Sequence, residues 1–188
     1  LPKVDTFHGF GHAMLKEFSR GTLPQIADDD ARAQVAAALI APENERWSPD
    51  ALLARISLAK QECIPEQSFG DDSEGILLWR GYEQEMARRN LMDLDDLVWR
   101  AFRLLEDEPG LAEFVAGRWQ SVSVDEYQDV NDVQAALIRR ISRNGQTLMA
   151  IGDPDQAIYG FRGARPGHFA RFVEEFPGAV SVTLGTTY

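Results

Sequence analysis

The sequence predicts an α/β fold in which a parallel β-sheet carries an inserted, all-helical unit. Two short β-prone runs, at residues 121–124 and 147–151, each lead into acidic residues and then into a helical pattern. Strands that alternate with helices indicate crossover connections and hence parallel strands. The region before them, residues 31–116, shows helical patterns and no strand signal.

Apolar spacing and helix-start signals place the helices of the first two thirds of the chain. Apolar residues from Phe10 to Phe18 recur at helical spacing and predict an amphipathic helix. Asp30 is a typical capping residue, and Ser48 followed by Pro49 is a typical cap and first turn. We expect helices over residues 8–18, 31–40, 50–63, 76–90, 94–106 and 111–116.

After Trp119 the pattern changes to short strands and helices. The expected order is a strand at residues 121–124, a helix at 131–142, a strand at 147–151, a helix at 166–176 and a strand at 179–184. The resulting domain division places residues 1–21 and 119–188 in the sheet domain and residues 22–118 in the helical insertion.

The composition indicates a globular chain with a hydrophobic core. Of the 188 residues 44% are apolar, and no apolar run approaches the roughly 20 residues that span a bilayer. The first ten residues lack the pattern of a signal peptide. The single cysteine, Cys63, is expected to be a buried apolar residue in a reducing compartment. We therefore expect a cytoplasmic protein without a membrane partner.

The formal net charge of −11 is awkward for a nucleic-acid-binding protein, because phosphate neutralisation requires Lys and Arg. The charge is unevenly distributed, however. Residues 159–171 carry Arg162, Arg165 and Arg171 and no acid. A charge total therefore identifies no partner here.

The first candidate site is the run VSVDEYQD at residues 122–129. In an open parallel sheet, ligands bind beyond the carboxyl ends of the strands, where Asp125 and Glu126 are expected. One carboxylate there can hold Mg²⁺, and its neighbour can accept a proton from an attacking water molecule. A nucleoside triphosphatase needs this arrangement, and a solvated acidic turn is the alternative.

The second candidate site follows the next strand, in the run GDPDQAIYGFRGA at residues 152–164. Gln156 would lie near the same sheet edge as Glu126, where a neutral amide can contact a terminal phosphate or position water. Tyr159, Phe161 and Arg162 suit single-stranded nucleic acid, because bases stack on rings and guanidinium groups meet phosphates. The alternative places the aromatic rings in the core and Arg162 on the surface.

Taken together, these runs resemble the Rep/UvrD-like family of superfamily 1 DNA helicases. Residues 122–129 are similar to that family's motif II, and residues 152–164 to its motif III. DTFHGF at residues 5–10 resembles motif Ib, and LDDLVWRAFRLL at residues 94–105 resembles a segment found before motif II. LGTTY at residues 184–188 resembles the beginning of motif IV, so the resemblance covers essentially the whole chain.

The resemblance implies a partial RecA-like parallel sheet domain with ATP and Mg²⁺ as cofactors. Asp125 would be the Mg²⁺-binding acid, and Glu126 would activate water. Gln156 would contact the terminal phosphate, Arg162 would lie close to both the nucleotide and the DNA, and Tyr188 would stack on adenine.

The resemblance also implies a DNA-binding surface. Tyr159 and Phe161 would face single-stranded DNA together with Arg162, although Phe161 stands where tryptophan is usual. Thr6 and His8 would lie on the surface that tracks along the DNA. The helical insertion would touch the duplex of forked DNA and offer a surface for protein partners.

One part of an ATP site is absent from the sequence. A phosphate-binding loop needs glycines and a Lys-Ser or Lys-Thr pair. The three lysines, Lys3, Lys16 and Lys60, are followed by Val, Glu and Gln. The sequence is therefore expected to be an internal helicase segment, from motif Ib to the start of motif IV, that does not hydrolyse ATP alone.

Three other functions fit parts of this pattern. A subunit of a helicase-nuclease would share all of these motifs. A non-catalytic protein-interaction module would suit the acidic surface but not the intact acids and glutamine. A metal-dependent nuclease would use Asp125, Glu126, Asp129 and Asp153, but would leave Gln156 and the aromatic run without a role.

Overall fold

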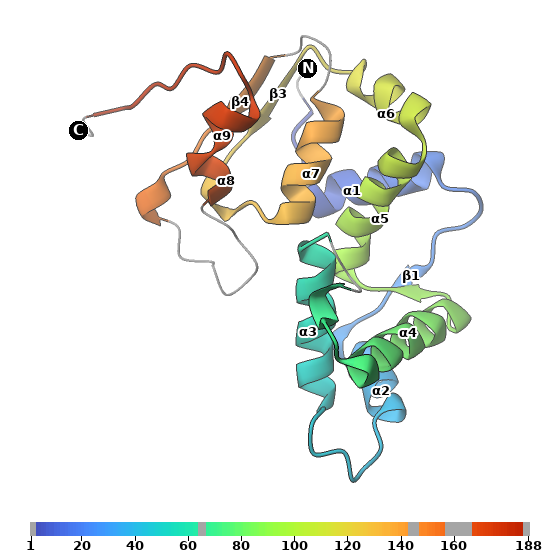
Figure 1. Ribbon diagram of the computed structural model, residues 1–188. Coiled ribbons are helices and arrows are strands. Elements are labelled where there is room, and N and C mark those ends of the chain that lie inside the picture. The colour runs from blue at the N-terminus through green and yellow to red at the C-terminus, as the bar shows by residue number, and fades with distance from the viewer. Residues whose placement is uncertain (1–2, 64–66, 143–146, 157–166, 186–188) are drawn as a thin grey trace.

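The structure is a computed structural model that describes residues 3–63, 67–142, 147–156 and 167–185. Figure 1 shows two lobes. The lower lobe consists of α2 (Asp29–Leu39), α3 (Pro49–Gln61) and α4 (Ser73–Arg88). The upper lobe consists of α1 (Phe7–Phe18), α5 (Leu94–Asp107), α6 (Pro109–Ala116), α7 (Asp132–Ile141), α8 (Gly167–Ala170), α9 (Phe172–Glu175) and the strands β3 (Ser121–Val124) and β4 (Thr147–Ala150).

The helices of the lower lobe begin at polar caps and enclose their own core. Asp28, Ser48 and Asp72 each accept a hydrogen bond from the backbone N–H three residues further on, which satisfies a donor of the first turn. The rings of Phe69 and Trp79 stack with their centroids 5.6 Å apart inside this core. The lower lobe is therefore a helical unit with its own hydrophobic centre.

The helices α1, α5, α6 and α7 of the upper lobe share a second core. At Gly11, α1 approaches α5 so closely that a Cβ atom would overlap the carbonyl group of Leu97, and glycine permits this contact. The predicted insertion of residues 22–118 includes α5 and α6, whose apolar residues belong to the core shared with α1 and α7 and not to the core of the lower lobe. The domain division itself stays a prediction.

A second, very short pair of strands connects the lobes. β1 (Gln25–Ile26) pairs in parallel with β2 (Leu91–Met92). In the chain, β1 lies between α1 and α2, and β2 lies between α4 and α5. The two chain crossings between the lobes therefore lie side by side and are hydrogen-bonded to each other.

The strands β3 and β4 pair in parallel, and Val124 lies opposite Ala150. The buried ring of Tyr127 follows β3 and contacts Phe169 and Phe172 from α8 and α9. Parallel strands joined through a helix confirm the predicted α/β class. In the described part of the chain, no helix is long and apolar enough to cross a membrane.

Several predicted elements differ from the structure. The single helix predicted at residues 166–176 is two short helices, because the backbone of Arg171 leaves the helical conformation. The cap of α2 is Asp28 and not Asp30, because the helix begins two residues earlier than predicted. Cys63 is only partly buried, at a left-handed residue with φ of 60° after α3.

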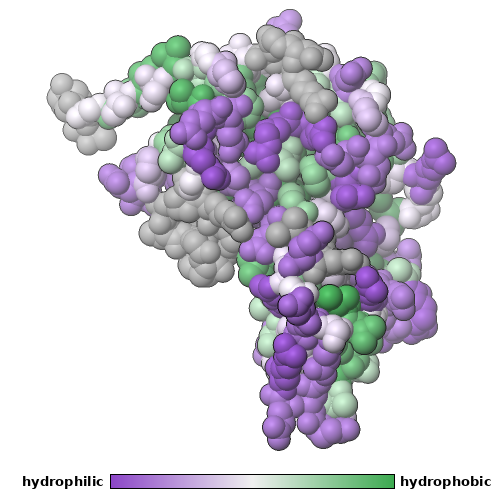
Figure 2. Space-filling model, in the orientation of Figure 1, coloured by the Kyte–Doolittle hydropathy of each residue, from purple (hydrophilic) through white to green (hydrophobic). Residues whose placement is uncertain are grey.

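The strand predicted at residues 179–184 is not formed. Val180, Val182 and Leu184 are 79–92% exposed, and they produce the hydrophobic surface along the C-terminal segment in Figure 2. A strand requires a hydrogen-bonded neighbour, and none of the described strands pairs with this segment.

Candidate functional site

The two candidate acidic runs lie next to each other at one end of the β3–β4 pair. Backbone hydrogen bonds continue the pairing past both strands, from Ile151 N–H to the Val124 carbonyl at 2.8 Å and from Tyr127 N–H to the Ile151 carbonyl at 2.9 Å. Asp125 and Asp153 therefore follow two adjacent strands at the same edge of the sheet. This is the edge at which ligands bind in open parallel sheets.

Asp125 and Glu126 occupy a tight, solvent-exposed turn directly after β3. One carboxylate oxygen of Asp125 accepts the backbone N–H of Glu126 at 3.0 Å. Glu126 has φ of 51° and ψ of 43°, in the left-handed region that few residues other than glycine adopt. Strained backbone of this kind clusters at functional sites, where the surrounding structure maintains it.

Gln128 lies beneath this turn and is 1% exposed. Its side-chain Nε2 donates to a carboxylate oxygen of Glu126 at 2.6 Å, and its Oε1 accepts the backbone N–H of Asp153 at 3.0 Å. A Cβ atom at Gly152 would overlap Oε1 of Gln128, so glycine permits this close approach. One buried amide therefore connects the two strand ends.

Gln156 lies in the short 3-10 helix Pro154–Gln156 that follows β4. Its Nε2 donates to Asp153 Oδ2 at 2.7 Å, and Asp153 Oδ1 accepts the backbone N–H of Asp155 at 3.0 Å. The Gln156 side chain is thereby held against the same turn that Gln128 contacts.

The residues predicted to meet DNA are only partly described. Thr6 is exposed and caps α1 by accepting the N–H of Gly9 at 3.0 Å, and His8 is exposed on the first turn of the same helix. The predicted roles of Tyr159, Phe161, Arg162 and Tyr188 fall on residues outside the described ranges.

The site fits a hard divalent cation at Asp125. Its carboxylate is solvent-exposed, and among the described residues only the N–H of Glu126 donates to it. Carboxylate oxygens are suitable ligands for Mg²⁺, which commonly retains several water ligands.

The nuclease alternative would need several acids close together at this edge. Of the described residues, the acids that come close enough together to hold an ion do not include Asp125, Glu126, Asp129 or Asp153. Both carboxylate oxygens of Asp153 already accept hydrogen bonds from its own turn.

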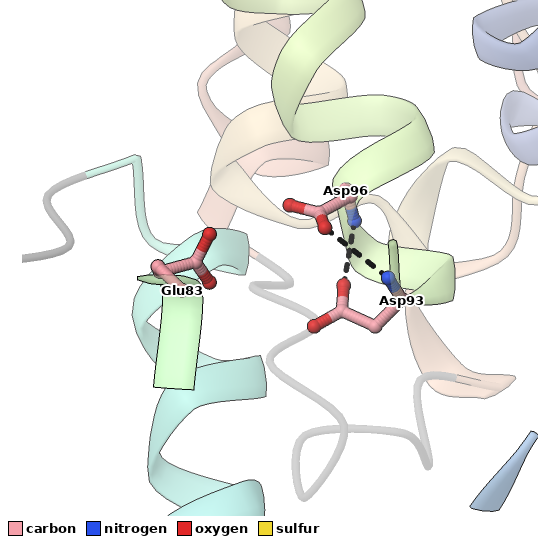
Figure 3. Close-up of side chains that lie close together, drawn as sticks. All are labelled: Glu83, Asp93 and Asp96. Carbon is pink, nitrogen blue, oxygen red and sulfur yellow. Dashed lines mark hydrogen bonds between the residues drawn. The ribbon is translucent and has the colours of Figure 1, made fainter. Parts of the chain in front are cut away.

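A separate acidic cluster consists of Glu83, Asp93 and Asp96, and Figure 3 shows their carboxylates facing one another. The Lys60 ammonium group fills the place that an ion would take, at 2.8, 2.8 and 2.9 Å from these three carboxylates. Burial by itself would lower the pKa of Lys60, but the three carboxylates outweigh it and raise that pKa above its ordinary value. The cluster is therefore an internal ion pair network and not a metal site.

His168 of α8 is buried against the start of α7. Nε2 of this buried imidazole lies 2.7 Å from a carboxylate oxygen of Asp132 at the start of α7. Arg139 of α7 also pairs with Glu175 of α9 at 3.0 Å. These contacts attach α8 and α9 to the helix that follows the acidic turn, and nothing in the sequence pattern predicted them.

The fold and the site define an α/β protein with an acidic and amide-rich site at the carboxyl ends of parallel strands. The family model for the UvrD/REP helicase N-terminal domain matches residues 1–177. The chain belongs to the UvrD/REP helicase family, and the resemblance seen in the sequence motifs is confirmed.

Curated relatives support the same family. The chain is 32% identical to DNA helicase II of Escherichia coli (strain K12) over 197 aligned residues, which covers 98% of this chain and 27% of that protein. It is 32% identical to the ATP-dependent DNA helicase PcrA of Staphylococcus epidermidis, covering 78% of this chain and 21% of that protein. The PcrA protein of Bacillus subtilis is 29% identical, with 77% and 20% covered. The chain thus spans between 20% and 27% of these relatives' lengths.

Proposed function

We propose that this chain supplies the water-activating half of the ATP site of a DNA helicase. The complete protein would couple ATP hydrolysis to translocation on single-stranded DNA and to duplex unwinding. The observation that carries this proposal is the adjacent placement of Asp125–Glu126 and Asp153–Gln156 at the ends of two paired parallel strands.

Three side chains at this edge, Asp125, Glu126 and Gln156, have chemistry that ATP hydrolysis requires. Asp125 would hold Mg²⁺, which supplies neutralising charge to the phosphates when bound. Glu126 would accept the proton of the attacking water, and its exposed position leaves room for that molecule. Gln156 would contact the terminal phosphate through a neutral amide, so that no repulsive charge is added.

The DNA-binding role rests on family membership and on residues at both ends of the chain. Thr6, which caps α1, and His8 in its first turn are exposed, and they would follow single-stranded DNA. Tyr159, Phe161 and Arg162 would contact the same strand, and Tyr188 would stack on adenine. The lower lobe would meet forked duplex DNA or a protein partner.

The proposal is tested on the complete purified protein. It should hydrolyse ATP only with Mg²⁺, single-stranded DNA should stimulate that hydrolysis, and a forked duplex should be separated. A folded protein that binds nucleotide but shows no DNA-stimulated hydrolysis would contradict the proposal.

A further inference from the structure

Gln128 is buried at the junction of the two candidate site segments, where both ends of its side-chain amide are hydrogen-bonded. We propose that Gln128 is a positioning residue that orients the Glu126 carboxylate and couples it to the loop that carries Gln156. This inference rests on the proposed function, because it assigns a role in activating water for ATP hydrolysis.

The two partners of Gln128 require opposite hydrogen-bonding properties. The Glu126 carboxylate accepts, so it needs a donor, whereas the Asp153 N–H donates and needs an acceptor. A primary amide offers both at a fixed separation. Glutamate would present only acceptors when ionised, and leucine would present neither, so neither residue can make both contacts.

The Glu126 backbone explains why its side chain needs an external support. The left-handed turn at Glu126 directs the chain into the 3-10 helix Tyr127–Asp129, and the Asp129 N–H donates back to the Glu126 carbonyl at 2.9 Å. The carboxylate itself is exposed, and a side chain with several rotatable bonds loses entropy when it is fixed. The 2.6 Å bond from Gln128 restricts it to one place, and charge-assisted bonds of this kind are the stronger ones.

The Gln128 amide also connects the Glu126 carboxylate to the loop that follows β4. The Asp153 backbone is bonded to Gln128, and the Asp153 carboxylate is bonded to the Gln156 amide at 2.7 Å. A displacement of Gln156 by a terminal phosphate would therefore move Asp153 and, through Gln128, the carboxylate of Glu126. The backbone of Gly152 lies directly against the Gln128 side-chain oxygen, because no Cβ atom fits between them.

The test compares Gln128→Leu and Gln128→Glu with wild type in the complete protein. Both variants should lose about tenfold or more in kcat for DNA-stimulated ATP hydrolysis, a part of the roughly 10²–10⁴-fold that a positioned general base contributes. The KM for ATP and the affinity for a fluorescent ATP analogue should stay within about threefold, because Gln128 is buried beneath the turn and would not reach a nucleotide bound at the surface.

Gln134→Leu is the matched control for a purely structural effect. Gln134 also accepts a backbone N–H, from Asn131 at 3.1 Å, and completes the cap of α7 without contacting Glu126. This variant should lower the melting temperature and leave kcat unchanged. If Gln134→Leu and Gln128→Leu lowered kcat equally at equal loss of stability, the positioning role would be overturned.

Glu126→Gln separates this inference from the function on which it rests. If Glu126→Gln abolishes hydrolysis and folded Gln128 variants keep wild-type kcat, only the positioning role fails. If Glu126→Gln retains full hydrolysis, the proposed function of this site fails first.

Discussion

The Lys60 ammonium group lies 2.8 Å from a carboxylate oxygen of Asp93, and each side chain is 1% exposed. Lys60 belongs to α3 in the lower lobe, whereas Asp93 caps α5 in the upper lobe and shares a capping box with Asp96. Ser57 of α3 adds a hydrogen bond to Asp95 at 2.6 Å. The residues at the start of α5, from Asp93 to Asp96, therefore hold the two lobes together through buried charges.

Replacing Lys60 by methionine should destabilise the protein strongly. The substitution keeps the approximate shape of the stem but leaves buried carboxylates without their cation, which costs about 3–5 kcal/mol of unfolding free energy. Urea denaturation of both proteins measures this difference. Lys16→Met, on the exposed face of α1, is the control and should change stability by less than about 0.5 kcal/mol. A loss below 1 kcal/mol for Lys60→Met would contradict the network described here.

The same network predicts how stability depends on pH. Burial alone would raise the pKa of Asp93, but Lys60 outweighs it and holds that pKa below its ordinary value of 3.8. The stabilisation from Asp93 is thus complete above pH 3.8 and is lost as the pH falls through its lower folded value. The pKa of Lys60 is raised, so its contribution is complete below its ordinary pKa of 10.5 and is lost as the pH rises through the folded value.

The unfolding free energy, measured against pH for wild type and Asp93→Asn, tests this assignment. The wild-type protein should lose stability below pH 3.8, and Asp93→Asn should weaken that dependence. Asp71→Asn, at an exposed loop position, should keep the wild-type acid dependence. Identical acid profiles for Asp93→Asn and wild type would show that Asp93 is not held ionised by Lys60.

Gly152→Ala should disturb the junction between the two strand ends. The added methyl group would overlap the Gln128 oxygen, and overpacking of this kind costs about 1–3 kcal/mol. In a Gln128→Ala background the cost should fall, because the overlapping group is gone. Gly110→Ala is the control, since a Cβ atom there meets nothing within 4 Å, and helix propensity makes it neutral or stabilising. Equal costs of Gly152→Ala in both backgrounds would refute the contact.

The predicted stacking role of Phe161 is tested by Phe161→Ala in the complete protein. Loss of one stacked base should weaken affinity for single-stranded DNA by about 1–3 kcal/mol. Fluorescence titration at fixed salt measures this change. Phe114→Ala, which removes a ring that is 57% exposed on α6, should leave the affinity unchanged. An unaltered titration for Phe161→Ala would favour a packing role for that ring.

The sequence predicted the sheet edge well because its signals are local. β3 was predicted with its observed bounds, and β4 within one residue. Ser48 caps α3 as the Ser-Pro signal indicated. That the acidic segments after β3 and β4 lie at one edge of the sheet also follows from the rule that parallel strands end at one edge.

The remaining features depend on contacts between distant segments. A two-residue strand such as β1 has no periodicity to recognise, and it forms only because Leu91 and Met92 lie beside it. The burial of Lys60 could not be predicted from the sequence, because lysine is rarely buried and the three carboxylates around it come from other parts of the chain. Gln128 lies within the DEYQD run, but its burial and its bond to Asp153 require the second strand to be in place.

ATP turnover by Glu126→Gln in the complete protein tests whether Glu126 activates the attacking water. The amide keeps the size of the side chain but cannot accept the proton. We therefore expect nucleotide binding to remain and DNA-stimulated hydrolysis to fall by about 10²–10⁴-fold. Hydrolysis at the wild-type rate in a folded Glu126→Gln protein would show that Glu126 does not activate the water.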